Sequence, residues 1–241
     1  THLYLPHFKE DIDEVVQRAV ENGVAKMLLP NINQESIRPM LELCRRFSQY
    51  CQPMLGLHPT SVKSEYRQEL AFLESIADRE DFIAIGETGM DAHWDTQYLS
   101  EQEDSFIIHL NWAEKSGLPV IIHSRKTTKR IIDIIKSSYA QKIRGIFHAF
   151  SGSVKQAMEI SELGFKIGIG GVVTYKNSNL SEVVKALDIS NIVLETDSPY
   201  LTPHPHRGRR NESSWLVYIA DEIAKIKGLS VEQVAEATTG N

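Results

Sequence analysis

Short apolar runs recur along the chain, with longer amphipathic segments between them. Each run is rich in Ile, Val, Leu and Phe and lacks polar alternation, which is typical of strands in a buried parallel sheet. We therefore predict seven strands, at residues 25–30, 54–58, 82–87, 119–123, 145–148, 165–169 and 192–197.

The segments between these runs have helical periodicity. In the second of them, Ile37, Leu41 and Cys44 recur at helical spacing, with charged residues on the other side. Gly117 and Gly164 each follow such a segment and precede a strand, where a glycine that ends a helix belongs. The predicted helices are 9–22, 35–49, 65–79, 101–116, 128–138, 154–163 and 180–187.

Regular alternation of strand and helix, without a linker or a break in composition, predicts one α/β domain over residues 1–241. An eighth strand would precede His2 and would be mostly missing from the sequence. A doubly wound open sheet is the alternative, but it would want a glycine-rich nucleotide loop after the first strand, and none is present. We therefore expect a (β/α)8 TIM-type barrel.

Composition narrows the function only slightly. The net charge of −6 argues against a protein held on nucleic acid by a broad basic surface. It leaves a nuclease open, because bound divalent cations can supply local positive charge. Cys44 and Cys51 fit no metal or disulfide motif, so we interpret them as buried free thiols of a cytoplasmic protein. No run is long enough to span a membrane.

The candidate chemistry lies at the ends of the predicted strands. In a barrel all carboxyl ends of the strands converge on one face, where active sites are built. Imidazole and carboxylate together suit zinc, manganese, nickel or iron, and tolerate magnesium less well. The five candidate ligands are His2, Glu87, His123, His148 and Asp197.

Each candidate also has a simpler interpretation. A histidine that closes an apolar strand is often only packed, and for His58 the two interpretations are balanced. Packing explains His123 and His148 poorly, because both occupy equivalent positions on neighbouring strands. Glu87 directly follows a buried run and needs a partner to offset its burial, whereas Asp197 could simply cap a turn.

The remaining aromatic and basic residues fall into two groups. Arg125 and Arg207 lie in loops after strands, where arginine suggests a phosphate clamp. For Arg209 and Arg210 a solvated basic loop is the alternative. We expect His7, His93 and His109 at the surface or behind the ligands, and we interpret the tryptophans as packing residues rather than base-stacking platforms. These are Trp94, Trp112 and Trp215.

Six motifs occur in order at matching spacing, and together they resemble the TatD family of metal-dependent deoxyribonucleases within the amidohydrolase-like superfamily. The resemblance covers essentially the whole chain. Each motif alone is weak, and the ordered set is specific. The motifs are GLHP at 56–59, GETGMD at 86–91, PVIIHSR at 119–125, HAFSG at 148–152, ETDSPYL at 195–201 and PHRG at 205–208.

The resemblance implies a barrel with two divalent metal ions, of which Mg, Mn, Zn and Ni are all open. His2 and Asp197 would bind one ion, Glu87 would bridge, and His123 and His148 would hold the other. The family pattern opens with a pair of histidines, and only the second, His2, is present; we expect the first just upstream of Thr1. His58, Arg125 and Arg207 match positions near the substrate phosphate.

The implied activity is hydrolysis of phosphodiester bonds in DNA, at single-stranded ends, by a metal-activated water that Asp197 helps to deprotonate. The alternative is an amidohydrolase-type enzyme acting on a small ester, lactone or cyclic amide. Many relatives with such chemistry bridge their metals with a modified lysine, where this chain has Glu87. A non-catalytic binding protein is a third reading, which the near-complete ligand set disfavours. We expect no membrane association and no obligate protein partner.

Overall fold

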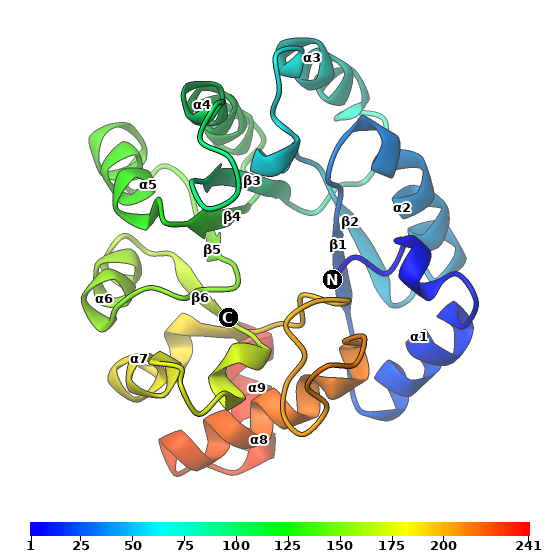
Figure 1. The fold of residues 1–241 in the computed structure, drawn as a ribbon, viewed down its shortest axis with the longest axis vertical. Helices are drawn as coiled ribbons and strands as arrows, with labels where there is room; N and C mark the ends of the chain where they lie inside the picture. Colours follow the sequence, from blue (N-terminus) through cyan, green and yellow to red (C-terminus); the bar gives the residue numbers. More distant parts are fainter. The chain divides into compact units, whose positions relative to one another are not determined.

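The structure is a computed structural model and describes residues 1–241. Strands and helices alternate along the chain (Figure 1). The strands are β1 (Met27–Pro30), β2 (Cys51–Met54), β3 (Ile85–Asp91), β4 (Val120–Arg125), β5 (Gly145–Phe147), β6 (Lys166–Ile169) and β7 (Ile192–Leu194). The α-helices are α1 (Ile12–Glu21), α2 (Gln34–Arg46), α3 (Tyr66–Ile76), α4 (Leu99–Ser116), α5 (Thr128–Ile134), α6 (Val154–Glu162), α7 (Leu180–Ala186), α8 (Leu216–Lys227) and α9 (Val231–Gly240).

Each of the seven predicted strands overlaps an observed strand, but none keeps both predicted bounds, and two are displaced along the chain. The prediction of 54–58 overlaps β2 only at Met54, and the chain beyond it contributes a single bridge from Leu55 to Ile85. The predicted strand 82–87 starts too early and ends too early, because β3 continues through a glycine-rich polar stretch to Asp91. The helices α8 and α9 were not among those predicted.

The chain divides into two compact units. Unit 1 comprises Thr1–Met27 and His148–Asn241, and unit 2 comprises Leu28–Phe147. Unit 2 is one continuous segment, whereas unit 1 combines the beginning and the end of the chain. The prediction of one domain over residues 1–241 stays a prediction.

Unit 2 is built on parallel strands. Strand β4 lies between β3 and β5, and its central residue Ile122 is paired with Thr88 on one side and Phe147 on the other. Helices α3, α4 and α5 lie on the same side of these strands (Figure 1). Ile122, Phe147 and Phe106 are all fully buried, so the core of this unit lies between the strands and α4.

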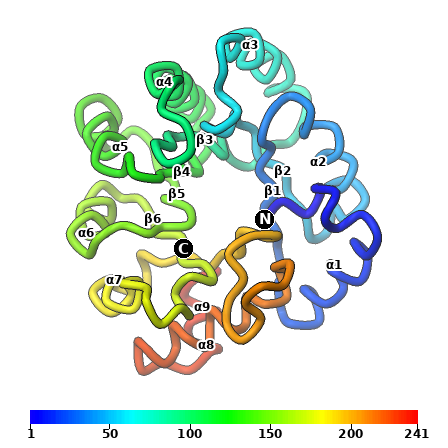
Figure 2. The backbone as a smooth tube through the Cα atoms, viewed as in Figure 1, coloured from blue at the N-terminus to red at the C-terminus, as the bar shows by residue number.

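Unit 1 contains the parallel pair β6 and β7 and the helices α1 and α6 to α9. Its two chain segments are joined by ion pairs: Arg18 of α1 donates to Glu212 from Nε at 3.0 Å and from Nη2 at 2.7 Å. Arg210 makes an equivalent two-bond pair with Asp11, at 2.7 and 2.6 Å. The tube in Figure 2 shows α1, in blue, beside the orange segment that carries Arg210 and Glu212.

Local sequence signals explain several helix ends. Asn33, Ser153 and Ser230 each cap a helix with a side-chain oxygen that accepts the backbone N–H three residues later. Gly117 ends α4 in the left-handed conformation, with φ of 71°, as the sequence predicts. These caps fix the residue at which each of these helices begins or ends. They therefore also fix where the adjoining loops begin or end.

Two further predictions can be compared with the structure. Cys44 and Cys51 are free and buried, and burial raises the pKa of each thiol to about 12. Both are therefore unreactive thiols at neutral pH. None of the helices combines the length and apolar composition that a membrane-spanning helix requires.

Candidate metal centre

Glu87 lies in an irregular stretch of strand β3. Ile85 pairs with Val120 and Thr88 with Ile122, so three steps along β3 match two along β4 and one residue is extra. Such bulges re-aim side chains and are common beside active sites. Gly89, with φ of +131°, allows the two strands to approach, because a Cβ there would lie 2.1 Å from the carbonyl oxygen of His123.

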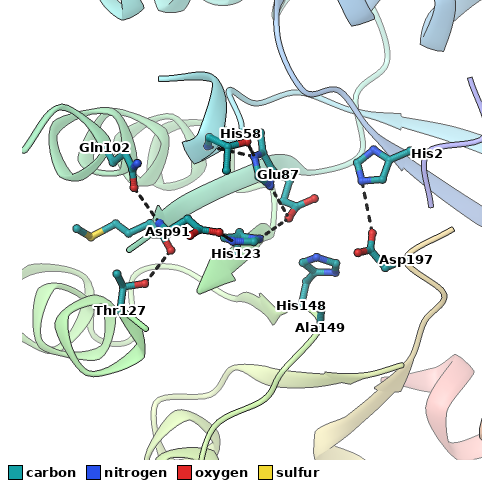
Figure 3. Close-up of polar contacts among 12 residues, drawn as sticks. His2, His58, Glu87, Asp91, Gln102, His123, Thr127, His148, Ala149 and Asp197 are labelled. Carbon is teal, nitrogen blue, oxygen red and sulfur yellow. Dashed lines mark hydrogen bonds and ion pairs between the residues drawn. The ribbon is translucent and has the colours of Figure 1, made fainter. Parts of the chain in front are cut away.

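His123 of β4 lies between two carboxylates of β3 (Figure 3). Its Nδ1 is 3.1 Å from Oε1 of Glu87, and its Nε2 is 2.8 Å from Oδ2 of Asp91. Both carboxyl groups are buried, Glu87 being 2% and Asp91 1% exposed. The Glu87 carboxylate is therefore buried directly against an imidazole ring.

The Asp91 carboxylate is ionised. Burial opposes its charge, but hydrogen bonds from His123 and from the backbone N–H of His93 outweigh this and lower its pKa to about 2. An ionised Asp91 accepts the Nε2–H of His123, so a neutral His123 ring presents its Nδ1 lone pair toward Glu87. Two lone-pair donors 3.1 Å apart repel one another, and a cation bound between them would remove that repulsion.

His58 completes a group of three possible ligands in unit 2. One ligand atom from each of His58, Glu87 and His123 lies within 4.8 Å of the others. The Nε2 of His58 is 3.4 Å from Oε1 of Glu87, whereas its Nδ1 accepts the backbone N–H of Thr60 at 3.2 Å. A neutral His58 therefore carries its proton on Nε2 and donates it toward Glu87, which fits the predicted role beside the substrate better than that of a ligand.

His148 of unit 1 is oriented by Glu195. Its Nδ1 is 3.2 Å from Oε2 of Glu195, whose other oxygen accepts the backbone N–H of Ala149 at 2.7 Å. Gly168 makes room for this carboxylate, since a Cβ there would lie 2.3 Å from Oε2. Metal-binding histidines usually donate their second ring nitrogen to such a carboxylate, so Nε2 is the atom through which His148 would bind a metal.

His2 and Asp197 form a second pair in unit 1 (Figure 3). Nε2 of His2 is 3.5 Å from Oδ1 of Asp197, and Nδ1 is 3.0 Å from the hydroxyl of Tyr4. The backbone supports the pair, because the N–H of His2 donates to the carbonyl of Ser198 at 2.8 Å. Residue 2 is thus fixed beside the loop that carries Asp197.

The two arginines expected near phosphate each lie over an aromatic ring. The guanidinium of Arg125 is 5.2 Å from the ring centroid of Trp94, and that of Arg207 is 3.8 Å from the ring of Tyr175. Stacking of this kind holds an arginine in place without using its hydrogen-bond donors. Arg210 is committed instead to its ion pair with Asp11, so it belongs to the structure of unit 1.

Three features go beyond the sequence prediction or correct it. Asp91 was not singled out, although it contacts His123 as closely as Glu87 does. His109 does lie behind the site, fully buried. The interpretation of Trp94 as a packing residue is wrong, because its side chain is 71% exposed.

The donor set is that of a metal site with mixed nitrogen and oxygen ligands. In unit 2 a buried carboxylate lies against an imidazole whose other nitrogen is held by a second carboxylate, and in unit 1 two further imidazoles each contact a carboxylate. Parallel α/β proteins with such residues at the ends of their strands are typically metal-dependent hydrolases.

The comparisons with known proteins identify the family. A family model described as TatD related DNase matches residues 1–241. The chain therefore belongs to the TatD-related DNase family of metal-dependent hydrolases. It is similar to the uncharacterized metal-dependent hydrolase YabD of Bacillus subtilis, with 34% identity over 241 residues, 100% of this chain and 94% of that protein.

Two further relatives bear on fold and function. The 3′-5′ ssDNA/RNA exonuclease TatD of Erwinia amylovora is 30% identical over 246 residues, which cover 100% of this chain and 95% of that protein. The crystal structure of YjjV, a TatD homolog from Escherichia coli, matches with a TM-score of 0.93 at 28% identity, over 99% of this chain and 93% of that one. The predicted α/β fold of the TIM-barrel type agrees with this match.

Proposed function

We propose that this protein hydrolyses phosphodiester bonds at single-stranded ends of DNA, with divalent metal ions as cofactors. The observation that carries the proposal is the position of His123, whose Nδ1 faces Glu87 at 3.1 Å while Asp91 holds its Nε2 at 2.8 Å. That arrangement orients an imidazole and a carboxylate toward a common cation. The relative from Erwinia amylovora, named as an exonuclease on single-stranded DNA and RNA, supports the substrate class.

The proposed ligands are the five residues that the family resemblance implies. Glu87 and His123 belong to unit 2, and His2, His148 and Asp197 belong to unit 1. A divalent ion held by such residues lowers the pKa of a bound water and stabilises charge on phosphate oxygens. The presence of two ions, the bridging role of Glu87 and the identity of the metal stay predictions of the family resemblance.

Asp197 is the proposed proton acceptor. Its side chain is 17% exposed and has a carboxylate oxygen 3.5 Å from His2, so it is both positioned and accessible to water. A carboxylate in that position can take a proton from the water that attacks phosphorus. The Nε2–H of His58 faces Glu87 at 3.4 Å, and when substrate is bound it can turn to donate to a non-bridging phosphate oxygen instead.

Arg125 and Arg207 are the proposed phosphate contacts. Guanidinium groups bind phosphate through paired hydrogen bonds, and both side chains keep those donors available while they rest on Trp94 and Tyr175. The net charge of −6 means that such contacts must be local. This favours a substrate end over a long stretch of nucleic acid.

The proposal is tested with single-stranded DNA labelled at the 5′ or the 3′ end, supplied with Mg, Mn, Zn or Ni, beside a panel of small esters and amides. We expect stepwise shortening of the DNA, loss of activity with a chelator, and loss of at least 100-fold in Glu87→Gln. The matched control is Glu74→Gln on the exposed face of α3. Full activity in Glu87→Gln, or inert DNA beside a cleaved small ester, would overturn the proposal.

A further inference from the structure

Trp94 is the most exposed large apolar side chain of the molecule. It is 71% exposed, whereas the next, Tyr200, is 51% exposed. An exposed indole leaves a large apolar surface in water, at a free-energy cost that packing would have removed. Single exposed apolar residues are common and need no functional explanation. Whether Trp94 has a function must therefore be judged from its neighbours.

The backbone of Trp94 is tied to the candidate metal centre through one side chain. Oδ1 of Asp91 accepts the backbone N–H of His93 at 2.8 Å and that of Trp94 at 3.3 Å. Oδ2 of the same carboxylate lies 2.8 Å from Nε2 of His123. The carboxylate that orients a proposed ligand therefore also fixes the turn from which the indole projects.

Arg125 places a positive charge beside this indole. Asp91 and Arg125 are partners in the register of β3 and β4, and the N–H of Ala92 donates to the carbonyl of Arg125 at 2.9 Å. The guanidinium lies over the Trp94 ring, 5.2 Å from its centroid. The ring of His93 also contacts the indole in a T-shaped arrangement, with the ring centroids 4.9 Å apart. Trp94 nevertheless stays 71% exposed, so a flat aromatic group can stack on the indole while its phosphate contacts the arginine.

A second aromatic ring, that of Tyr98, lies beside Trp94 in the lining of a pocket. Trp94, Tyr98, Lys63 and Asp91 border a small pocket in unit 2. Nζ of Lys63 is 5.2 Å from the centroid of the Tyr98 ring and 3.8 Å from Oδ2 of Asp95. Aromatic rings combined with cationic side chains are the pattern by which proteins bind single-stranded nucleic acid without reading its sequence.

We propose that Trp94 is a stacking platform for a nucleobase of the nucleotide whose phosphate contacts Arg125. The inference rests on the proposed function, because it names how the substrate of that same site is held. Every nucleobase has a face on which an indole can stack, so the platform selects single-stranded nucleic acid over base-free phosphodiesters and is indifferent to sequence. The ligand class is thus an unpaired nucleotide with its base splayed away from its neighbours.

The first test is a binding measurement that needs no catalysis. In the variant Trp112→Phe/Trp215→Phe, Trp94 is the only tryptophan, and stacking of a base on it quenches its fluorescence. The metal-loaded protein is titrated with phosphorothioate trithymidylate, which resists hydrolysis, and with an abasic trinucleotide of the same backbone. We expect saturable quenching by the first only. Equal quenching by both, or none by trithymidylate, would overturn the platform.

The second test measures preference for the base during turnover. The ratio of kcat/KM for trithymidylate to that for the abasic trinucleotide is expected to fall about tenfold in Trp94→Ala, mainly through KM, and to recover in Trp94→Phe. Met158→Ala, which removes another exposed apolar side chain, on α6, is the control. An unchanged ratio in Trp94→Ala would overturn the inference.

The two proposals fail in different ways. If neither trinucleotide is hydrolysed but trithymidylate still quenches Trp94, the platform stands and the nuclease activity does not. If both are hydrolysed at the same rate and neither quenches Trp94, the activity stands and the platform is wrong. The fluorescence and hydrolysis measurements together therefore separate the inference from the function on which it depends.

Discussion

The backbone N–H of Leu57 donates a hydrogen bond to Nε2 of His109 at 2.9 Å, although the two residues are 52 positions apart. His109, on α4, is fully buried, and its Nδ1 donates to the carbonyl of Ser105 at 2.6 Å. Because Leu57 directly precedes His58, this buried imidazole fixes the segment that carries one of the proposed phosphate contacts. The helix α4 thereby positions a residue of the segment that follows β2.

Replacing His109 by phenylalanine removes the acceptor of a buried N–H. We expect His109→Phe to lower the free energy of unfolding by about 1–3 kcal/mol, the usual cost of a buried donor without a partner. His109→Gln, which can still accept from Leu57, should lose less. Urea denaturation at pH 7.5 measures both variants. Equal stability of the phenylalanine variant and the original protein would show that the Leu57 N–H finds another partner.

The same histidine makes stability depend on pH. Burial lowers the pKa of His109 to about 4 from its ordinary 6.5, against a raising effect of the bond to Ser105. Above pH 6.5 the ring is neutral in both states. Between 6.5 and about 4 only the unfolded chain takes up the proton, so this contribution to stability is lost as the pH falls, by roughly 3 kcal/mol in total. Urea denaturation at pH 7.5, 5.5 and 4.5 should therefore show a steeper loss in the original protein than in His109→Gln; parallel curves would contradict the assignment.

Asp91→Asn tests the support of His123. Asparagine has a single acceptor oxygen: if it keeps the backbone N–H bonds of His93 and Trp94, its NH2 group faces Nε2 of His123, and the Nε2–H loses its acceptor. Such changes behind a ligand typically weaken metal binding by 10–100-fold. We expect that loss in the affinity for Zn or Mn, measured by calorimetry. Asp95→Asn, whose side chain is 49% exposed, is the matched control. Identical affinities in the two variants would mean that Asp91 does not orient a ligand.

Glu195→Gln tests the corresponding contact in unit 1. Glu195 accepts from the ring of His148 at 3.2 Å and from the N–H of Ala149 at 2.7 Å. With glutamine, His148 loses a charged acceptor, and we expect 10–100-fold weaker metal binding or activity with little change in stability. Glu182→Gln on α7 is the exposed control. Unfolding of the variant at room temperature would instead indicate that Glu195 is needed for the fold of unit 1.

Glu212→Gln tests the ion pair that joins the two segments of unit 1. The Glu212 carboxylate is buried and receives two bonds from Arg18, which keep its pKa low despite burial. We expect a loss of about 1–3 kcal/mol in unfolding free energy, since hydrogen bonds to charged groups are the strong ones. Glu42→Gln, which removes the exposed pair with Arg38, should cost no more than about 0.5 kcal/mol. Equal losses of unfolding free energy in the two variants would show that the buried ion pair contributes no more to stability than the exposed one.

Strand and helix order could be predicted from the sequence because buried parallel strands are plain apolar runs. The ends of the strands could not be predicted as well, and β3 shows why. The apolar run stops before Gly86, but the backbone continues paired with β4 as far as Asp91. If the predicted strand 82–87 had been extended by four residues, Glu87 and Asp91 would have been placed on the same face, because side chains alternate along a strand with a period of two. Asp91 would then have been a candidate site residue.

Other differences have other physical causes. Trp94 could not be recognised as exposed, because the same residue type fills cores and covers binding surfaces. The roles of Asp91 and Glu195 depend on which oxygen meets which ring nitrogen, and spacing along a chain does not contain that information. The helices α8 and α9 had usable signals, in Gly228 and in the Ser230–Gln233 cap. For these two helices the sequence was sufficient and the prediction incomplete.

Unit 1 is built from two chain segments that are far apart in the sequence, and this affects the order in which the parts of the protein can fold during synthesis. Arg18 and Glu212 are 194 positions apart, so at about 5–20 residues per second the helix α1 waits roughly 10–40 s on the ribosome for its partner. Meanwhile unit 2, a continuous segment, can fold as it emerges. The apolar face of α1, with Val15, Val16 and Ala19, stays uncovered during that interval. The nascent chain therefore offers chaperones an uncovered apolar segment in α1, which becomes covered only after Glu212 has been synthesised and unit 1 has assembled.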